Sequence, residues 1–233
     1  MSHNIFMELA PYGSLGELIR KGGALFEATV RIYTHMLLKG LHCIHEKGVV
    51  HCDLKPYNIL MFPTWKSQTW NQVKIADFGL AKTREEADAE LGLRKLKFRG
   101  TACYMSPESV IGVIGTALDI WSLGCIVIEM MTGLDAWNNI ESRKDLMLKL
   151  ALHREAPPIP EGMSWVCKDF LSKCFVKNPT RRSTAAMLLN HPFINSSYDN
   201  NMQTSHTDYQ TPSQSVTNSS LFSYDLFDYL PRY

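Results

Sequence analysis

The stretch His51-Cys52-Asp53-Leu54-Lys55-Pro56-Tyr57-Asn58 decides how this chain folds. Within six residues it places a carboxylate (Asp53), a cation (Lys55) and an amide (Asn58), and the proline among them is typical of a loop. The two residues before it, Val49-Val50, predict a short strand. A single acid in a loop most simply caps that loop, so the weight of this stretch depends on what else the chain contains.

Four further motifs follow in the chain. The first, Asp77-Phe78-Gly79, comes directly after a β-like run, Val73-Lys74-Ile75, and one alanine. The others are Gly100-Thr101 with Tyr104-Met105-Ser106-Pro107-Glu108, Asp119-Ile120-Trp121-Ser122-Leu123-Gly124, and Asn178-Pro179-Thr180-Arg181-Arg182-Ser183-Thr184. Each motif alone is a modest signal, and a bare Asp-Phe-Gly often occurs by chance. Five of them in one order leave little room for coincidence.

In this order the motifs resemble those of serine/threonine protein kinases, over roughly residues 1–194. The resemblance implies a fold that is mainly α with a few short β-strands, like the carboxy-terminal lobe of a kinase. It also implies phosphoryl transfer to a protein hydroxyl, with ATP and Mg²⁺ as cofactors. That chemistry needs a carboxylate to orient the hydroxyl, oxygen ligands for the metal, and a cation near the transferred group.

The resemblance also implies a role for each site residue. Asp53 would be the catalytic base that orients the substrate hydroxyl, and Lys55 would stabilise the charge on the transferred phosphate. Asn58 and Asp77 would be the magnesium ligands, so Asp77 would also help to hold the nucleotide. The hydroxyl of Thr101 could bond both Asp53 and Lys55. The lysine favours serine and threonine over tyrosine as the phosphorylated residue.

The first residues of the chain resemble a kinase hinge, the segment that holds adenine through backbone groups. In Met7-Glu8-Leu9-Ala10, Met7 would be the gatekeeper, while Glu8 C=O and Ala10 N–H would bond the adenine. Leu60 would form part of the apolar floor beneath it. The alternative for residues 7–10 is simply a buried edge strand.

Three residues are expected to hold the site together without taking part in the chemistry. By the same resemblance, Glu108 would pair with Arg182, and Asp119 would accept backbone N–H bonds from the catalytic loop. Leaving either acid buried without its partner should cost about 3–5 kcal/mol.

Cys52 departs from the family pattern, which usually has an arginine there that binds a phosphate on the activation segment. Between Asp77 and Thr101 the chain offers only Thr83 for phosphorylation. We therefore expect regulation by phosphorylation of this segment to be weak or absent. The His-Cys-Asp version of the loop is similar to plant mitogen-activated protein kinase kinase kinases, whose substrate would be a mitogen-activated protein kinase kinase.

A second departure is the amino lobe of the family, which we expect to be absent. The chain contains no Gly-rich loop, no strand lysine for the phosphates and no partner glutamate on a helix. Residues 1–13 would be the last strand and hinge of that lobe, and residues 14–194 the carboxy-terminal lobe. Two functions stay open: a kinase that is truncated and has little or no activity as given, or a kinase-like binding module that competes for substrates or partners.

Local patterns predict where the helices lie. Ser14 and Glu17 form a capping-box pattern for a short helix ending near Gly22-Gly23. An apolar stripe marks a long helix that Gly48 ends, and the nearly all-apolar run 118–131 predicts a helix buried in the core. The stripe consists of Phe26, Val30, Tyr33, Leu37, Leu41 and Ile44. Further helices are expected at about 142–152, 164–175 and 183–190.

Residues 195–233 form a tail of different composition. Its polar part, up to residue 220, cannot bury enough apolar area to order itself. The aromatic and acidic end, residues 221–230, would either dock on a partner or on the domain, or be a disordered end.

Composition excludes several classes of function. The 233 residues carry a formal net charge of +1, which argues against nucleic acid or an anionic membrane as a partner. No apolar run approaches the roughly 20 residues of a membrane span, and the first residues lack a signal-peptide layout. We expect a protein of the cytoplasm, with the nucleus as a second location. The six scattered cysteines would be reduced thiols, and zinc at His42, Cys43, His45, His51 and Cys52 fits no usual ligand spacing.

Overall fold

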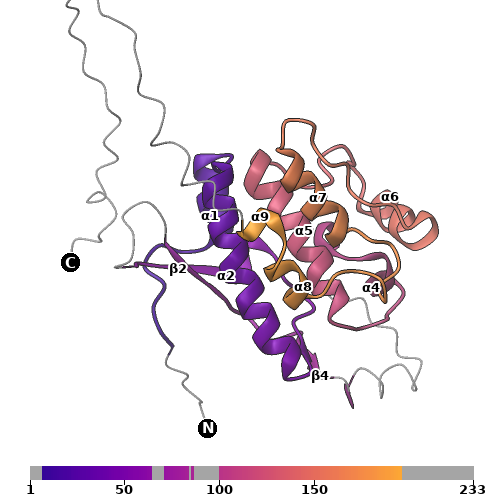
Figure 1. Ribbon diagram of the computed structural model, residues 1–233. Coiled ribbons are helices and arrows are strands. Elements are labelled where there is room, and N and C mark those ends of the chain that lie inside the picture. The colour runs from indigo at the N-terminus through magenta and orange to yellow at the C-terminus, as the bar shows by residue number, and fades with distance from the viewer. Residues whose placement is uncertain (1–6, 65–70, 84, 87–99, 196–233) are drawn as a thin grey trace, which may run out of the picture. The chain divides into compact units, whose positions relative to one another are not determined.

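The computed structural model describes residues 7–64, 71–83, 85–86 and 100–195 (Figure 1). Helices dominate these residues, and the strands are short, so the predicted class, mainly α with a few short β-strands, is confirmed. The helices are α1 (Leu15–Gly22), α2 (Glu27–Glu46), α4 (Pro107–Val110), α5 (Ala117–Thr132), α6 (Arg143–Leu148), α7 (Trp165–Cys174), α8 (Ala185–Leu189) and α9 (Pro192–Asn195). A π-helical turn, Lys149–His153, continues α6, and 3₁₀ turns occupy Pro56–Asn58 and Ala102–Tyr104.

Helix α1 begins with the predicted capping box. Ser14 Oγ accepts the N–H of Glu17 at 3.2 Å, and the Ser14 N–H donates to Glu17 Oε2 at 2.9 Å. Two N–H groups that an isolated helix end would leave unpaired are thereby satisfied. The helix ends at Gly22, where the sequence predicted, and Gly23 follows with a φ of 73°.

Helix α2 buries one face, as its periodicity predicts. Val30, Tyr33, Leu37 and Leu41 are all buried on that face. Phe26 was expected in the same stripe, but its side chain is 88% exposed. This expectation was wrong because Phe26 is the N-cap, with an extended backbone, so helical spacing does not place its side chain.

Helix α5 is the centre of the core. Every residue from Leu118 to Ile128 is buried, which confirms the prediction from the run 118–131. Helices α2 and α7 pack against it, with α8 and α9 against α2 (Figure 1). A helix surrounded in this way has no face for water, which is why its sequence is apolar almost all round.

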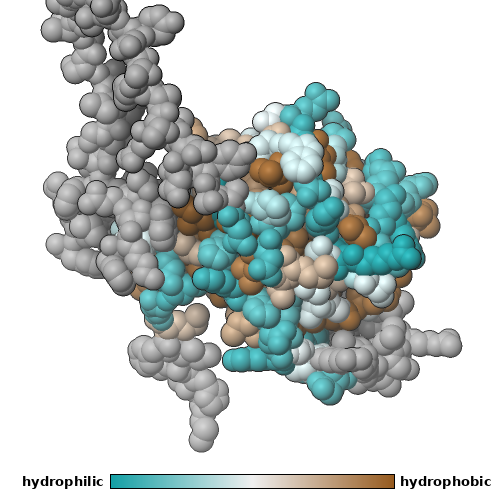
Figure 2. Space-filling view, viewed as in Figure 1, coloured by the Kyte–Doolittle hydropathy of each residue, from teal (hydrophilic) through white to brown (hydrophobic). Residues whose placement is uncertain are grey.

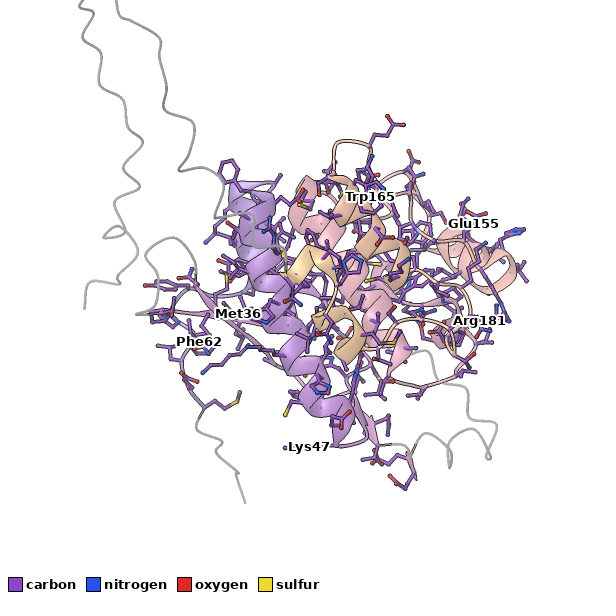
Figure 3. The ribbon with its side chains drawn as sticks, in the orientation of Figure 1. Met36, Lys47, Phe62, Glu155, Trp165 and Arg181 are labelled. Atoms are coloured by element: carbon purple, nitrogen blue, oxygen red, sulfur yellow. The ribbon has the colours of Figure 1, made fainter. Side chains whose placement is uncertain are left out.

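Four strands form two antiparallel pairs among the described residues. β2 (Ile59–Phe62) pairs with β3 (Gln72–Ile75), and β1 (Val49–Val50) pairs with β4 (Lys82–Thr83). The sequence predicted β1 and most of β3 but missed β2 and β4. The apolar run of β2 has no alternation to mark it as a strand, and β4 (Lys82–Thr83) lacks the two β-branched apolar residues that indicated β1. The β2–β3 pair lies against α2, where Val73 N–H meets Met36 Sδ at 3.5 Å (Figure 3).

The surface agrees with the balanced composition. On the face shown in Figure 2, hydrophilic and hydrophobic residues are interspersed. No helix among the described residues is both long and apolar enough to cross a membrane. None of the six cysteines, all of which are described, forms a disulfide, and within the described ranges no group of three or more His, Cys, Asp or Glu side chains is arranged to hold a metal ion. The predicted tail, residues 195–233, lies outside the described residues apart from Asn195, as do residues 1–6 of the predicted strand and hinge.

Candidate functional site

The loop at residues 51–55 is anchored to the core by one buried carboxylate. Asp119, at the start of α5, is fully buried and accepts the N–H of His51 at 2.9 Å and of Cys52 at 3.1 Å. The resemblance implied backbone N–H bonds from this loop to Asp119, and the structure identifies His51 and Cys52 as the donors. Sequence reasoning missed the third partner, His45 Nε2 at 2.8 Å from the same carboxylate. No local signal marks His45, because it lies 74 residues before Asp119 and meets it only through the packing of α2 on α5.

Asp53 is the centre of a cluster of polar side chains. Lys55 Nζ lies 2.7 Å from Asp53 Oδ2, and Thr101 Oγ1 donates to Asp53 Oδ1 at 2.9 Å. Lys55 Nζ also donates to Thr101 Oγ1 at 3.2 Å, so the expected double bonding of this hydroxyl is observed. Asn58 Nδ2 donates to Asp53 O at 2.9 Å and to Oδ2 at 3.3 Å. The structure thus brings together all four residues that were predicted as catalytic.

Asp77, the second predicted magnesium ligand, lies beside this cluster because of the register in which strands β2 and β3 pair. Ile59 pairs with Ile75, and Ala76 N–H donates to Asn58 O at 2.9 Å, so Asp77 follows directly beside Asn58. Asp77 is exposed, has a φ of 62°, and its Oδ1 accepts the N–H of Gly79 at 3.3 Å. A left-handed backbone at a non-glycine residue is uncommon and often marks a functional position.

The two predicted metal ligands suit a hard cation. The amide nitrogen of Asn58 is occupied by Asp53, which leaves Asn58 Oδ1 as the acceptor of that side chain. The second oxygen of the Asp77 carboxylate has no partner among the described residues. One amide oxygen and one carboxylate are the donors that Mg²⁺ takes in nucleotide sites, where phosphates and waters complete its shell. The donor set therefore fits magnesium, and the assignment stays a prediction.

His51 joins the two halves of the site, a role that sequence reasoning missed. Its ring is fully buried, with Nε2 at 3.0 Å from Ala76 O, and Nδ1 accepts the N–H of Asp53 at 3.3 Å. The ring also meets Phe78 edge-on at 5.0 Å between centroids. One imidazole thereby couples the backbone of Asp53 to the segment that carries Asp77. The motif contains this histidine, but its partner lies 25 residues away and only the tertiary structure identifies it.

The predicted adenine-binding residues lie near one another in part. Gly13 follows Ala10 in a turn, and Gly13 O accepts the N–H of Met61, next to Leu60. Leu60 is partly buried, and the Ala10 N–H has no acceptor among the described residues. Glu8 uses its side chain in an exposed ion pair with Lys74, at 2.5 Å, so its backbone carbonyl is not engaged by that contact.

Residues 7–10 correct one expectation. They are irregular, and Met7 and Leu9 are 75% and 82% exposed, so the alternative of a buried edge strand is wrong for this stretch. An irregular backbone beside solvent can leave N–H and C=O groups available to a ligand. The gatekeeper position of Met7 and the adenine contacts stay predictions.

Cys52 occupies a constrained position in the loop. Its φ is 67°, and its Sγ lies 3.6 Å from Val50 O. A Cβ on Gly100, which has a φ of 94°, would come within 2.7 Å of Cys52 O, so only glycine fits beside this carbonyl. A cysteine side chain lacks the positive charge with which an arginine pairs with a phosphate, and the expectation of weak regulation by phosphorylation stays a prediction.

A partly buried acid, Glu129, lies behind the segment that carries Thr101. Tyr104 Oη donates to Glu129 Oε2 at 2.6 Å. Burial raises the pKa of Glu129, the hydrogen bond from Tyr104 partly offsets this, and the charge of Asp135 raises the pKa further. The folded protein therefore keeps a proton on Glu129 at a pH where the unfolded chain has lost it.

Glutamine at position 129 should therefore stabilise the fold by an amount that grows with pH. Because the pKa of Glu129 is raised in the folded state above its ordinary value of 4.5, its contribution to the free energy of unfolding falls as the pH rises beyond that value. Glutamine does not titrate and can still accept the Tyr104 hydrogen bond. Urea unfolding of Glu129→Gln and wild type at a series of pH values checks this, with the exposed Glu161→Gln as control. A difference between variant and wild type that does not change with pH would contradict it.

Comparison with known proteins agrees with this geometry. The protein kinase domain family matches residues 1–194. Mitogen-activated protein kinase kinase kinase 20 of Arabidopsis thaliana is 46% identical over 197 residues, which cover 82% of this chain and 56% of that protein. Mitogen-activated protein kinase kinase kinase 18 of the same plant is 39% identical over 198 residues, which cover 83% of this chain and 55% of that protein. Mitogen-activated protein kinase kinase kinase A of Dictyostelium discoideum is 36% identical over 198 residues, which cover 84% of this chain and 20% of that protein.

The chain thus spans about half the length of the Arabidopsis relatives numbered 18 and 20. The predicted resemblance to plant mitogen-activated protein kinase kinase kinases is confirmed at 38–46% identity. A domain match over residues 1–194 includes all five motifs and every residue of the cluster around Asp53. On this basis the chain belongs to the protein kinase family.

Proposed function

We propose that this chain is a serine/threonine kinase of a mitogen-activated protein kinase cascade, which phosphorylates a mitogen-activated protein kinase kinase. The observation that carries the proposal is the cluster in which Asp53, Lys55 and Thr101 bond one another within 3.2 Å beside Asn58. Serine/threonine specificity is supported by Lys55 and by the hydroxyl at position 101. The relatives' printed names support the place in the cascade.

Each residue of the cluster has a distinct task in this proposal. Asp53 accepts a hydrogen bond from the substrate hydroxyl, aims its oxygen at the phosphate, and takes up its proton. Lys55, fixed at 2.7 Å from Asp53, meets negative charge as it develops on the transferred group. Thr101 holds both side chains in register. Asn58 and Asp77 would hold Mg²⁺, which neutralises charge on the nucleotide phosphates.

The 233-residue polypeptide by itself is proposed to transfer phosphate poorly. Its sequence contains no G-x-G-x-x-G loop, and the loss of one preorganised charge contact typically costs about 2.7–4 kcal/mol in a transition state. With ATP, Mg²⁺ and a general serine/threonine substrate, the purified chain should label no more substrate than its Asp53→Asn and Asp77→Asn variants. Turnover above both variants would overturn this expectation.

The kinase function itself is tested in a chimera that adds a Gly-rich loop, a strand lysine and a helix glutamate to these residues. A chimera joins the Gly-rich strand, lysine and partner helix of kinase kinase kinase 20 from Arabidopsis to residues 7–195. It should phosphorylate serine or threonine in a mitogen-activated protein kinase kinase, and Asp53→Asn should remove that labelling. A folded chimera that binds ATP yet labels no serine or threonine would count against the proposed function and in favour of a binding module.

A further inference from the structure

Two aromatic side chains lie open to solvent where two neighbouring helices begin. Phe26, the N-cap of α2, is 88% exposed, and Trp165, the first residue of α7, is 75% exposed (Figure 3). No other Phe, Tyr or Trp side chain that the structure describes is as exposed. The two helix starts are joined directly, because the Ser164 hydroxyl donates to Glu27 Oε1 at 2.6 Å.

Leu134 adds a third exposed apolar side chain nearby. It follows the end of α5 and is 55% exposed. The N–H of Leu25 donates to Met130 O at 2.7 Å, and a Cβ on Gly133 would come within 2.9 Å of Ala24 N. The segment that leads into α2 therefore lies against the end of α5.

We call Phe26, Leu134 and Trp165 the helix-end patch, and its aromatic members do not serve the fold. N-cap positions favour Ser, Thr, Asp or Asn, whose side chains accept a backbone N–H, whereas Phe26 makes no such bond. Trp165 begins a helix that Ser164 already caps. Residues that break a local preference often belong to a functional surface, and aromatic side chains are enriched in protein interfaces.

The size of the patch suits a contact with a second copy of this chain. One buried Phe or Trp contributes about 150–250 Å², so the three side chains together present about 400 Å² of apolar surface. A twofold axis that pairs the patch with itself doubles this area to about 800 Å². With the residues around it, such a contact reaches the roughly 1,000 Å² at which specific interfaces begin.

The charges close to the patch fit the same partner. Both signs occur among the charged side chains near it in the sequence, which include Lys21, Asp135, Glu161 and Lys168. A border with both signs can pair with itself across a twofold axis, whereas an anionic membrane selects cations alone. The formal net charge of +1 leaves little repulsion between two copies.

We propose that the chain forms a homodimer in which the helix-end patch of one copy packs against the same patch of a second copy. Phe26 and Trp165 supply most of the apolar area, and Leu134 extends it. No residue of the cluster around Asp53 belongs to the patch. The inference concerns assembly, so it stands or falls independently of the proposed kinase function.

Sedimentation velocity of the purified 233-residue chain tests the proposal. Between about 1 and 100 µM, the weight-average mass should rise from that of one chain, 26.5 kDa, toward twice that value. Because a twofold contact uses the patch of both copies, the mass should not grow beyond the dimer.

Two variants remove the aromatic side chains without weakening the helices that carry them. Phe26→Ser introduces a favoured N-cap, and Trp165→Glu places an acid in the first turn of a helix, where it is favourable. Since a twofold contact loses each side chain twice, either variant should weaken dimerisation by about tenfold or more. Circular dichroism during heating should show that both variants keep the fold.

Met187→Glu is the matched control. Met187 is 61% exposed in the first turn of α8, a helix that Thr184 caps, and it lies outside the patch. The change again replaces an exposed apolar side chain by an acid near a helix start. This variant should dimerise as the wild type does.

Dimerisation that depends on Phe26 and Trp165 but not on Met187 supports the inference. A wild-type chain that keeps the mass of one chain up to about 100 µM overturns it, as does a dimer that the two patch variants leave intact. Vesicles of phosphatidylcholine and phosphatidylserine provide a further arm. A monomeric chain that sediments with these vesicles, and no longer does so in Trp165→Glu, would assign the patch to a membrane and overturn the homodimer.

Discussion

Replacing Arg182 by methionine is expected to lower the free energy of unfolding by about 3–5 kcal/mol. Arg182 is 4% exposed, and its guanidinium bonds Glu108 through Nη1 at 2.5 Å and Nη2 at 3.0 Å. It also donates to Ala117 O at 2.7 Å and Val176 O at 2.9 Å. Methionine fills similar space but leaves the buried Glu108 carboxylate and these carbonyls without a donor.

Urea unfolding followed by circular dichroism measures this effect. The neighbouring Arg181→Met provides a matched control, because Arg181 is exposed at the surface (Figure 3) and should cost less than about 0.5 kcal/mol. The double variant Glu108→Gln with Arg182→Met should lose less than the sum of the two single losses, since each single change already breaks the pair. Equal losses at positions 181 and 182 would show that the buried pair does not stabilise the fold.

Replacing Asp119 by asparagine is expected to lower the free energy of unfolding by about 2–4 kcal/mol and to loosen the loop at residues 51–55 first. One buried carboxylate now accepts bonds from His51 N–H, Cys52 N–H and His45 Nε2. Asparagine has the same shape but only one acceptor oxygen, so its NH₂ group must face a donor in a fully buried site. The loop that carries Asp53 would lose part of its anchor while the core of α5 stays packed.

Hydrogen exchange gives the local readout for this variant. The amides of His51 and Cys52 should exchange faster in Asp119→Asn, whereas amides in the middle of α5 should change only as much as global stability does. Asp145→Asn replaces an exposed acid in the first turn of α6 and should alter neither region. Unchanged protection at His51 and Cys52 in Asp119→Asn would mean that the loop is held by other contacts.

Local features of the fold could be predicted where the signal lies within a few residues. The capping box at Ser14 and Glu17, the stripe on α2 and the all-apolar α5 each depend on neighbours three or four positions apart. The strand pair β2–β3 was only half recognised, because β2 has no alternation to mark it. The exposed Phe26 shows the same limit, since a periodic pattern does not reveal which residue begins the helix.

The candidate site likewise combines residues that the sequence identifies with contacts that only the structure shows. The sequence by itself determined which groups are available: a carboxylate, a cation and an amide within residues 53–58, and a second carboxylate at Asp77, in an order that identified the family. Those residues are close in the chain or belong to recognisable motifs, so their chemistry can be read without knowing the path of the backbone.

Only the tertiary structure decided what surrounds this cluster. His45 reaches Asp119 across 74 residues, His51 reaches Ala76 across 25, and the groove beside Thr101 joins residues 100–103 to residues 135–146. Such contacts depend on how α2, α5 and α6 pack, and packing is set by burial summed over the whole core. The residues of the cluster around Asp53 could therefore be named from the sequence, while the histidines that anchor this loop and the walls of the neighbouring groove could not.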